Sequence, residues 1–283
     1  MMEDLSSGIL YLVGTPIGNL EDITLRAIRI LQQVDTIAAE DTRRTGKLLQ
    51  HLQIDTPQIS YYEHNHSSRI ENLLARLRQG AKIALVTDAG MPSISDPGYE
   101  LVREAIANSV TVVPIPGVTA AVCALAASGL PTYRFVFEGF LPQKNKFKKE
   151  RLDALQSETR TTIFYEAPHR LQQTLKDLGA SLGIERQIVI ARELTKIHEE
   201  FWRGSINEAI ALYETSRQPK GEYTLVVAGA IPEVAIATEA ELITELEQLL
   251  KQGMTRSQAS SYLAKISNFS RRKIYKLAVE IVS

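Results

Sequence analysis

The sequence predicts an α/β protein with two α/β domains and a small C-terminal helical appendage. Three observations predict this. The chain has 283 residues, enough for about two domains of roughly 150 residues each. Short apolar runs of strand length alternate with segments of helical periodicity as far as residue 230. From residue 239 onward the strand pattern ends and only helical spacing remains.

The first part of the chain alternates regularly between the two periods. Expected strands are residues 9–13, 36–39, 58–62, 82–87 and 110–114, and expected helices are residues 23–34, 45–52, 69–78 and 99–107. This alternation predicts a mostly parallel sheet with helices on its faces. The alanine-rich segment 118–128 predicts a buried helix. Gly129 and Pro131 follow it, so we expect the first domain to end near Leu130.

The second part repeats the alternation with less regularity. Expected strands are residues 135–137, 161–165, 187–191, 199–203 and 223–228, and expected helices are residues 145–156, 170–178 and 206–215. The strand at 199–203 is expected to pair antiparallel with a neighbour. Three short helices, residues 241–251, 256–266 and 270–282, then complete the chain. The predicted second domain therefore spans residues 131–235, and the helical tail spans 236–283.

Composition limits the class of protein. The net charge of −1 excludes a protein that is basic overall. Cys123 is the single cysteine, so neither an intrachain disulfide nor a cysteine zinc cluster can form, and a cytoplasmic protein is expected. Residues 1–7 are polar and acidic and do not predict a signal peptide. No apolar run reaches the ~20 residues of a membrane span, and no histidine spacing predicts a metal site.

Three loops at expected strand ends carry the chemistry: residues 14–19 (GTPIGN), 87–98 (TDAGMPSISDPG) and 114–120 (PIPGVTA). None is a dinucleotide fingerprint or a P-loop. Ligands of open α/β sheets bind at the carboxyl ends of the strands. Gly90 would let a ligand approach the backbone, and Asp88 suits a ribose hydroxyl or an ammonium group. Asp96 could contact the ligand or cap the next helix, and Thr119 could do both.

In this order, the three loops resemble those of the tetrapyrrole methylase family, and the resemblance covers residues 9 to 230. It implies S-adenosylmethionine (SAM) as cofactor, bound in a deep cleft between two α/β domains. For Tyr165, stacking on adenine and packing in the core both stay open. The residues expected to bind SAM are Pro16, Asp88, Gly90, Ser93, Ile94, Thr119, Ala120, Tyr165 and Leu225.

Small-molecule methylases of this family have Gly-x-Gly-x-Gly-Asp in the first loop and Gly-Asp-Pro in the second. Residues 14–19 (GTPIGN) and 89–92 (AGMP) depart from both patterns, and this weakens the argument for a porphyrin substrate. Residues 39–45 (AEDTRRT), 62–65 (YEHN), 164–170 (FYEAPHR) and 191–196 (ARELTK) with Glu199 instead resemble one bacterial branch. That branch methylates the 2′-hydroxyl of a cytidine in the decoding-centre region of 16S ribosomal RNA. The resemblance implies 16S rRNA or the small ribosomal subunit as partner, and a homodimer.

Methyl transfer from a sulfonium to a hydroxyl is an in-line displacement, in which a base or a cation near the hydroxyl should help. The candidates are Glu40, Asp41, Glu166, His169, Arg192 and Lys196, which the sequence does not rank. Helix capping is an equally good interpretation of the two residues at 40–41, and a surface histidine of the one at 169. A precorrin-type small-molecule methylase and a non-catalytic RNA-binding protein remain the alternatives.

Basic residues gather in two segments. Residues 144–151 hold five basic side chains and one acidic, and residues 251–276 hold seven basic and none acidic. Such segments suit contact with a phosphate backbone, although charged runs are often only solvated. The expected RNA contacts are Arg43, Arg44, Arg170, Lys144, Lys146, Arg271, Arg272 and Lys273. The alternative for the tail is a helical brace of a dimer or a domain.

Overall fold

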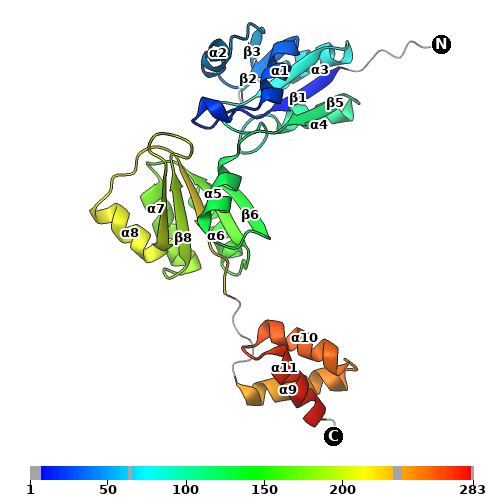
Figure 1. The fold of residues 1–283 in the computed structure, drawn as a ribbon, viewed down its shortest axis with the longest axis vertical. Helices are drawn as coiled ribbons and strands as arrows, with labels where there is room; N and C mark the ends of the chain where they lie inside the picture. Colours follow the sequence, from blue (N-terminus) through cyan, green and yellow to red (C-terminus); the bar gives the residue numbers. More distant parts are fainter. Residues whose placement is uncertain (1–7, 63–65, 232–237, 282–283) are drawn as a thin grey trace, which may run out of the picture. The chain divides into compact units, whose positions relative to one another are not determined.

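A computed structural model describes residues 8–62, 66–231 and 238–281 (Figure 1). The chain divides into two compact units, Met1–Gln156 with Arg160–Ala228, and Ser157–Thr159 with Gly229–Ser283. The expectation about a signal peptide at residues 1–7 lies outside the described residues. So do most of the segment 62–65 and the last residue of the expected final helix. The predicted α/β class is confirmed.

The first sheet is parallel throughout, with strand order β3-β2-β4-β1-β5. Its strands are β1 Ile9–Val13, β2 Thr36–Ala39, β3 Gln58–Ser60, β4 Lys82–Val86 and β5 Thr111–Ile115. The connecting helices are η1 Leu20–Asp22, α1 Leu25–Gln33, α2 Thr42–His51, α3 His66–Arg78 and α4 Tyr99–Ala107. Because all five strands run the same way, the loops that follow them lie at one edge of the sheet.

Both faces of this sheet are buried. On β4, Ala84 and Val86 belong to one hydrophobic core while Ile83 and Leu85 belong to the other, as the alternation of side chains in a strand requires. The core that includes Ala84 also takes residues from α1 and α2, and the opposite core takes residues from α3 and α4. Strands buried on both faces read as continuous apolar runs, which explains the sequence pattern.

The second sheet is mixed, with strand order β6-β7-β10-β8-β9, and only β6 and β7 are parallel. Its strands are β6 Phe135–Phe140, β7 Thr161–Glu166, β8 Gln187–Arg192, β9 Glu200–Ser205 and β10 Tyr223–Val227. The helices are α5 Ala120–Ser128, α6 Asn145–Leu155, α7 Leu171–Leu182 and α8 Ile206–Thr215. The expected antiparallel strand near 199–203 is confirmed as β9, which pairs with β8.

Helix α5 packs with the second sheet, although it lies within the range expected for the first domain. It precedes Leu130, yet Ala121, Ala124 and Leu125 pack in the core of the second sheet, together with residues of β7, β8 and β10. The change from one sheet to the other therefore occurs in the loop between β5 and α5. The alanine-rich composition did indicate a buried helix, but it cannot show which sheet buries it.

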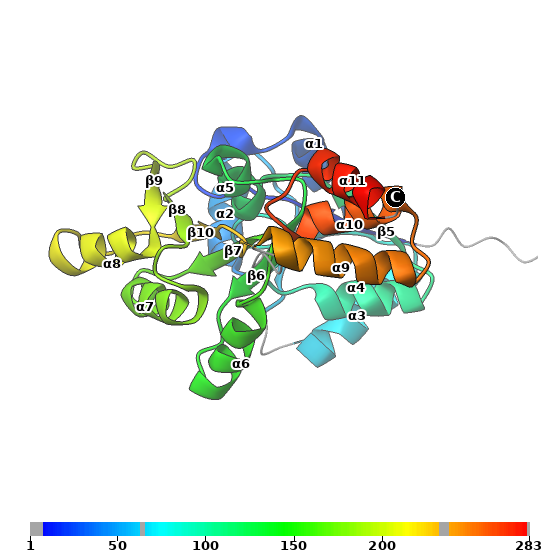
Figure 2. The same cartoon turned by 90° about the horizontal axis from the view of Figure 1, so that it is seen from below.

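The second unit contains three helices, α9 Glu239–Lys251, α10 Arg256–Ile266 and α11 Arg271–Glu280. Thr238, Thr255 and Ser270 cap their N-termini by accepting backbone hydrogen bonds. The helices pack on one another around a small core that includes Leu242, Leu246 and the side chains facing them (Figure 2). In the described part of the chain, no helix is long and apolar enough to cross a membrane.

Several element boundaries differ from expectation: β6 extends three residues beyond the expected end at 137, and α7 extends four residues beyond the expected end at 178. The helix expected at 45–52 begins at Thr42, because the Asp41 carboxylate accepts a hydrogen bond from the Arg43 amide and starts the helix earlier. The strand expected at 58–62 ends at Ser60.

Candidate active site

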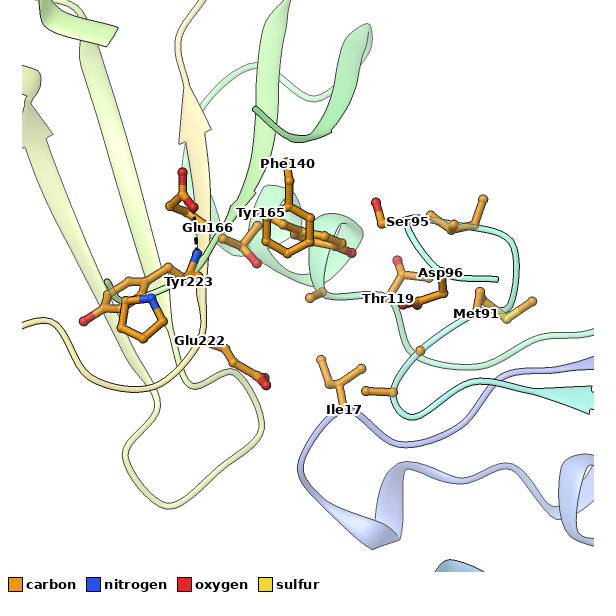
Figure 3. A pocket seen from close by; sticks show the side chains of 17 residues that line it. Ile17, Met91, Ser95, Asp96, Thr119, Phe140, Tyr165, Glu166, Glu222 and Tyr223 are labelled. Atoms are coloured by element: carbon orange, nitrogen blue, oxygen red, sulfur yellow. Dashed lines mark hydrogen bonds between the residues drawn. The ribbon is translucent and has the colours of Figure 1, made fainter. Parts of the chain in front are cut away.

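A pocket of about 420 Å³ lies within the first unit, where the loops after β1 and β4 and the start of α5 face the ends of β6 and β7 and the start of β10 (Figure 3). This volume is within the range of roughly 300–1,000 Å³ that is typical of small-molecule sites. The residues that line it are Ile17, Ala89, Gly90, Met91, Ile94, Ser95, Asp96, Thr119, Ala120, Phe140, Tyr165, Glu166, Ala167, Pro168, Glu222, Tyr223 and Thr224.

The loop between β4 and α4 forms much of one wall and has an unusual backbone. The backbone has positive φ, between +63° and +141°, at Gly90, Ser93, Ser95 and Gly98, a range that residues other than glycine rarely adopt. Thr15 and Gly90 exchange two backbone hydrogen bonds, of 2.9 and 3.0 Å, which fix this loop to the one after β1. The loop is thus held in one conformation by its neighbour.

Aromatic side chains form the facing wall. The ring of Tyr165 makes edge contacts with Phe137 and Phe140, at centroid distances of 5.0 and 5.8 Å. Its hydroxyl oxygen accepts a hydrogen bond of 3.2 Å from the amide of Ala121 in the first turn of α5. Burial raises the pKa of this phenol, so it remains protonated near neutral pH. Tyr165 therefore both lines the pocket and packs against its neighbours.

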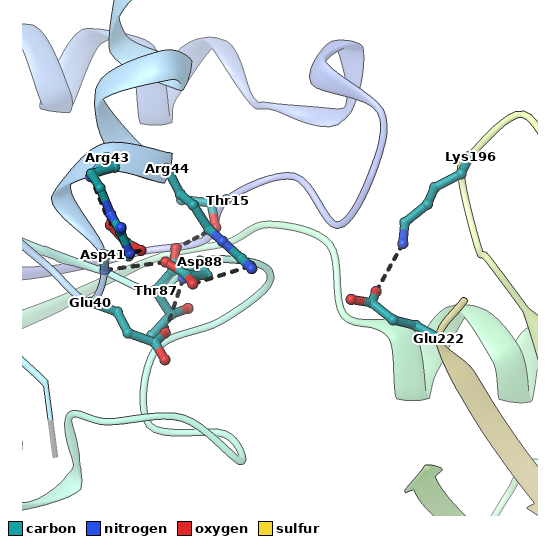
Figure 4. A network of polar contacts seen from close by, with 9 residues as sticks. All are labelled: Thr15, Glu40, Asp41, Arg43, Arg44, Thr87, Asp88, Lys196 and Glu222. Carbon is teal, nitrogen blue, oxygen red and sulfur yellow. Dashed lines mark hydrogen bonds and ion pairs between the residues drawn. The ribbon is translucent and has the colours of Figure 1, made fainter. Parts of the chain in front are cut away.

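A second polar network lies at the carboxyl ends of β2 and β4 (Figure 4). The amide of Asp88 donates to the Glu40 carboxylate at 3.1 Å, and the amide of Asp41 donates to Asp88 at 3.2 Å. Arg44 pairs with Asp88 at 3.2 Å. Burial is the main cause that raises the pKa of Glu40 and of Asp88. The Arg43 guanidinium binds Asp41 and holds the pKa of that carboxyl well below its usual range.

Five of the nine residues expected to bind SAM line the pocket, and four do not. Pro16 and Asp88 line a smaller neighbouring cavity of about 170 Å³, next to Arg44. The Ser93 hydroxyl is buried without a partner in the described structure, close to Gly98. Leu225 is fully buried in the hydrophobic core of the second sheet and is not part of the pocket wall. The five that line it are Gly90, Ile94, Thr119, Ala120 and Tyr165.

The catalytic candidates are dispersed. Glu166 lines the pocket, but its fully buried carboxylate accepts from the Ala167 amide and from Thr174, and it pairs with Arg170 at 3.3 Å. Glu40 and Asp41 belong to the network beside the pocket. His169 is exposed and does not line the pocket.

The basic catalytic candidates have structural partners. Arg192 donates to the Lys220 carbonyl at 2.7 Å. The amine of Lys196 pairs with Glu193 at 2.8 Å and with Glu222 at 3.0 Å. A β-carbon at Gly18 would lie 2.4 Å from Cγ of Lys196, so the lysine stem rests directly on the loop after β1.

The side chains predicted to contact RNA differ in their exposure and in whether they already have partners within the protein. Arg170 is only 19% exposed and is held by Glu166 and by the Leu141 carbonyl, so it is a structural residue. Lys144 and Lys146 are exposed at the start of α6. Arg43 and Arg44 are exposed but pair with Asp41 and Asp88, as described above.

Sequence reasoning missed several lining residues. For Asp96 the sequence left ligand contact and a helix cap open; it lines the pocket, while the N-cap of α4 is Gly98 and no side chain caps that helix. Met91 lies in the predicted loop without having been singled out. Phe140 follows a register shift in β6 that the sequence does not signal. In the described residues, no group of three metal-ligating side chains occurs.

Comparison with known proteins places this geometry in a family. Residues 9–210 match the Tetrapyrrole (Corrin/Porphyrin) Methylases. The chain is 57% identical over 275 residues to Ribosomal RNA small subunit methyltransferase I of Synechocystis sp., covering 97% of this chain and 98% of that protein. It is 45% identical over 284 residues to the protein of the same name from Escherichia coli O157:H7, covering 98% and 96%.

Solved structures agree on the fold. A uroporphyrin-III-C-methyltransferase from Thermus thermophilus has a TM-score of 0.56 and 23% identity, over 78% of this chain and 94% of that chain. The methyltransferase CobJ has a TM-score of 0.58 and 16% identity, over 80% and 95%. At these identities the likeness concerns the fold alone. The match to the family model over residues 9–210, more than half of the chain, shows that the chain belongs to the tetrapyrrole methylase family.

Proposed function

We propose that this protein transfers a methyl group from SAM to the ribose 2′-hydroxyl of a cytidine in 16S rRNA. The observation that carries the proposal is the match, over nearly the whole chain, to relatives named as methyltransferases of small-subunit rRNA. That match includes the helical tail, which lies beyond the 9–210 match to the methylase family. The alternative, a precorrin-type methylase, explains the first unit but leaves the tail without a role.

The pocket fits SAM in size and chemistry. Its aromatic and aliphatic side chains suit an adenine ring, and its carboxylates suit a cationic ligand. Gly90 has a positive φ and no side chain, so its backbone forms part of the pocket wall. When bound there, SAM supplies an electrophilic methyl group on a positively charged sulfur. The chain's part is to hold both reactants in line and to accept the hydroxyl proton.

The test is methyl transfer from labelled SAM to isolated small ribosomal subunits, to free 16S rRNA and to a porphyrin precursor, followed by analysis of the nucleosides. We expect label in 2′-O-methylcytidine. Label in the porphyrin precursor and none in RNA would favour the alternative.

We further propose that the tail contacts RNA through one face of α11. Arg272, Tyr275, Lys276 and Val279 are exposed at helical spacing, so they share a face. Of the three predicted contacts in this helix, Arg271 donates to Ser257 at 3.0 Å. Lys273 pairs with Glu239 at 2.6 Å and lies over the Phe269 ring at 4.7 Å. Arg272 is therefore the best placed of the three for phosphate contact.

The double variant Arg272→Ala, Lys276→Ala tests this face. Each lost phosphate contact should flatten the log–log salt dependence of RNA binding by about one unit. SAM affinity should not change, because the pocket lies in the other unit. Arg26→Ala with Arg29→Ala, two exposed arginines of α1, is the control of equal charge change. A double variant that keeps the wild-type salt slope and affinity would refute the role.

Homodimerisation and a cytoplasmic location complete the proposal. The family resemblance supports the first, and a ribosomal substrate supports the second. Light scattering of the purified chain should give twice the 31.5 kDa mass of one chain.

A further inference from the structure

The smaller cavity, of about 170 Å³, lies beside the pocket and is bordered by helix α2 and by the loops after β1 and β4. The two cavities share these loops. Thr15 and Asp88 line the smaller one, and Ile17 and Gly90, each two residues further along its loop, line the pocket. The smaller cavity is below the usual size of a site for a whole small molecule, so it suits a single ring. A base and the ribose joined to it therefore fit into adjoining spaces.

A buried hydroxyl at this cavity lacks a hydrogen-bond partner. Thr87 is only 2% exposed and lines the cavity, and in the described part of the chain nothing pairs with its Oγ1. The hydroxyl of Thr15, which is also buried, donates to the Thr87 carbonyl at 3.1 Å. Leaving a buried hydroxyl unpaired costs free energy, so an unpaired one beside a cavity indicates a ligand that completes it.

Opposite charges lie side by side at the same cavity (Figure 4). The guanidinium of Arg44 pairs with Oδ2 of Asp88 at 3.2 Å, and Oδ1 of this carboxylate accepts from the Asp41 amide. A carboxylate has about four acceptor sites and a guanidinium has five N–H groups, so both keep hydrogen-bonding capacity for a ligand. The pair therefore presents an acceptor next to several donors.

This order of groups matches the edge of a cytosine. Cytosine donates from its 4-amino group and accepts at N3 and O2, so a carboxylate can bind the amino group while a guanidinium binds the acceptors. Uracil accepts at O4 and donates at N3, and it would place an oxygen against the carboxylate of Asp88. Pro16 and Leu48 also line the cavity and give the faces of the ring apolar contacts.

We propose that the smaller cavity binds the base of the target nucleotide, and that Asp88 and Arg44 select cytosine over uracil. The Thr87 hydroxyl adds a third contact. This inference rests on the function proposed above. A cytosine held in the cavity is unstacked from its neighbours, as sequence-specific recognition of single-stranded RNA requires. Its ribose then lies at the pocket, and Asp88 belongs to the base site and not to the cofactor site expected from the sequence.

The first experiment compares reconstituted small ribosomal subunits in which the methylated cytidine is kept or replaced by uridine. Wild type should methylate the cytidine with a kcat/KM about 10- to 100-fold higher, the discrimination that one good base contact gives. In Asp88→Asn the amide can donate to O4 of uracil, so the two substrates should react almost equally. Asp55→Asn, which changes an exposed aspartate away from both cavities, should keep the wild-type ratio.

Two further variants separate a base contact from other roles. Arg44→Lys keeps the positive charge and loses the planar set of donors. It should lower the ratio of the two kcat/KM values, whereas an arginine that contacts only phosphate would leave this ratio unchanged. Thr87→Val keeps the shape of the side chain and removes the unpaired hydroxyl. Its melting temperature should not fall, while its kcat/KM for the cytidine substrate should fall about 3- to 10-fold.

Calorimetry with SAM shows whether Asp88→Asn still folds and binds the cofactor. Its Kd for SAM should match that of wild type, because the residues that line the pocket do not include Asp88. An unchanged cytidine-to-uridine ratio in Asp88→Asn, with or without a loss of SAM affinity, would overturn the inference. Wild type that methylates cytidine and uridine equally would overturn it as well. Wild-type protein that methylates no RNA would instead overturn the proposed function, and with it the base site.

Discussion

Replacing Asp96 by Asn should make the first unit more stable at alkaline pH and leave its stability nearly unchanged at acid pH. Burial raises the pKa of this carboxyl from 3.8 to about 7, so the folded state holds a proton that the unfolded chain releases. The wild-type protein therefore loses stability as the pH rises from about 4 through 7. Asn carries no charge and avoids this loss.

The magnitude follows from the shift. About three pKa units correspond to about 4 kcal/mol at 1.36 kcal/mol per unit. Asp96 is only partly buried, and solvent screening reduces the expected gain to about 1–2 kcal/mol at pH 8.

Trp202 gives a selective assay. It is the single tryptophan of the chain and packs against the core of the second sheet, so its fluorescence reports unfolding of the first unit alone. Urea unfolding of wild type, Asp96→Asn and Asp55→Asn would be compared at pH 5 and pH 8. If the stability that Asp96→Asn gains over wild type between pH 5 and pH 8 is no larger than the gain of Asp55→Asn, the Asp96 carboxylate does not experience the environment described.

Three further results are expected. Glu166→Gln should destabilise the first unit by about 3 kcal/mol in the same assay, because it leaves buried Arg170 without its charge partner. Gly90→Val should weaken SAM binding in calorimetry and also lower stability by about 1–2 kcal/mol, since φ there is +89°; an unchanged SAM affinity would remove this loop from the site. Lys273→Ala should lower the melting temperature of the second unit, measured by calorimetry, through loss of its contact with Glu239, while RNA binding by the folded protein keeps its salt slope.

The sequence was sufficient for the elements and for the edge at which the site lies. Apolar runs followed by glycine and proline loops predicted the strands and their carboxyl ends, and the pocket lies there. It was not sufficient to assign side chains to faces on a strand buried on both sides. All five residues of β10 are buried, so alternation gives no signal that Leu225 faces the core while Thr224 lines the pocket.

The second limit of prediction from the sequence is that it does not show which distant side chains pair. Arg170 follows Glu166 by four residues, a spacing that a sequence shows, but its position against the Leu141 carbonyl depends on packing with a distant part of the chain. Lys273 likewise reads as a free cation in a basic segment, yet it meets Glu239, 34 residues away. Charge counts predict an electrostatic surface only after such pairs are removed.

Asp96 shows how the same residues permit two interpretations that only geometry separates. An aspartate shortly before a helix is a common N-cap, because its side chain can accept from the first free amides. Here Pro97 and the left-handed Gly98 turn the chain between Asp96 and α4, and no side chain caps that helix. The carboxylate is thereby left facing the pocket with two like charges nearby. The charge of a capping aspartate would stabilise the folded protein, whereas the charge of Asp96 destabilises it. Because the two effects have opposite signs, the pH dependence of unfolding distinguishes the two interpretations directly.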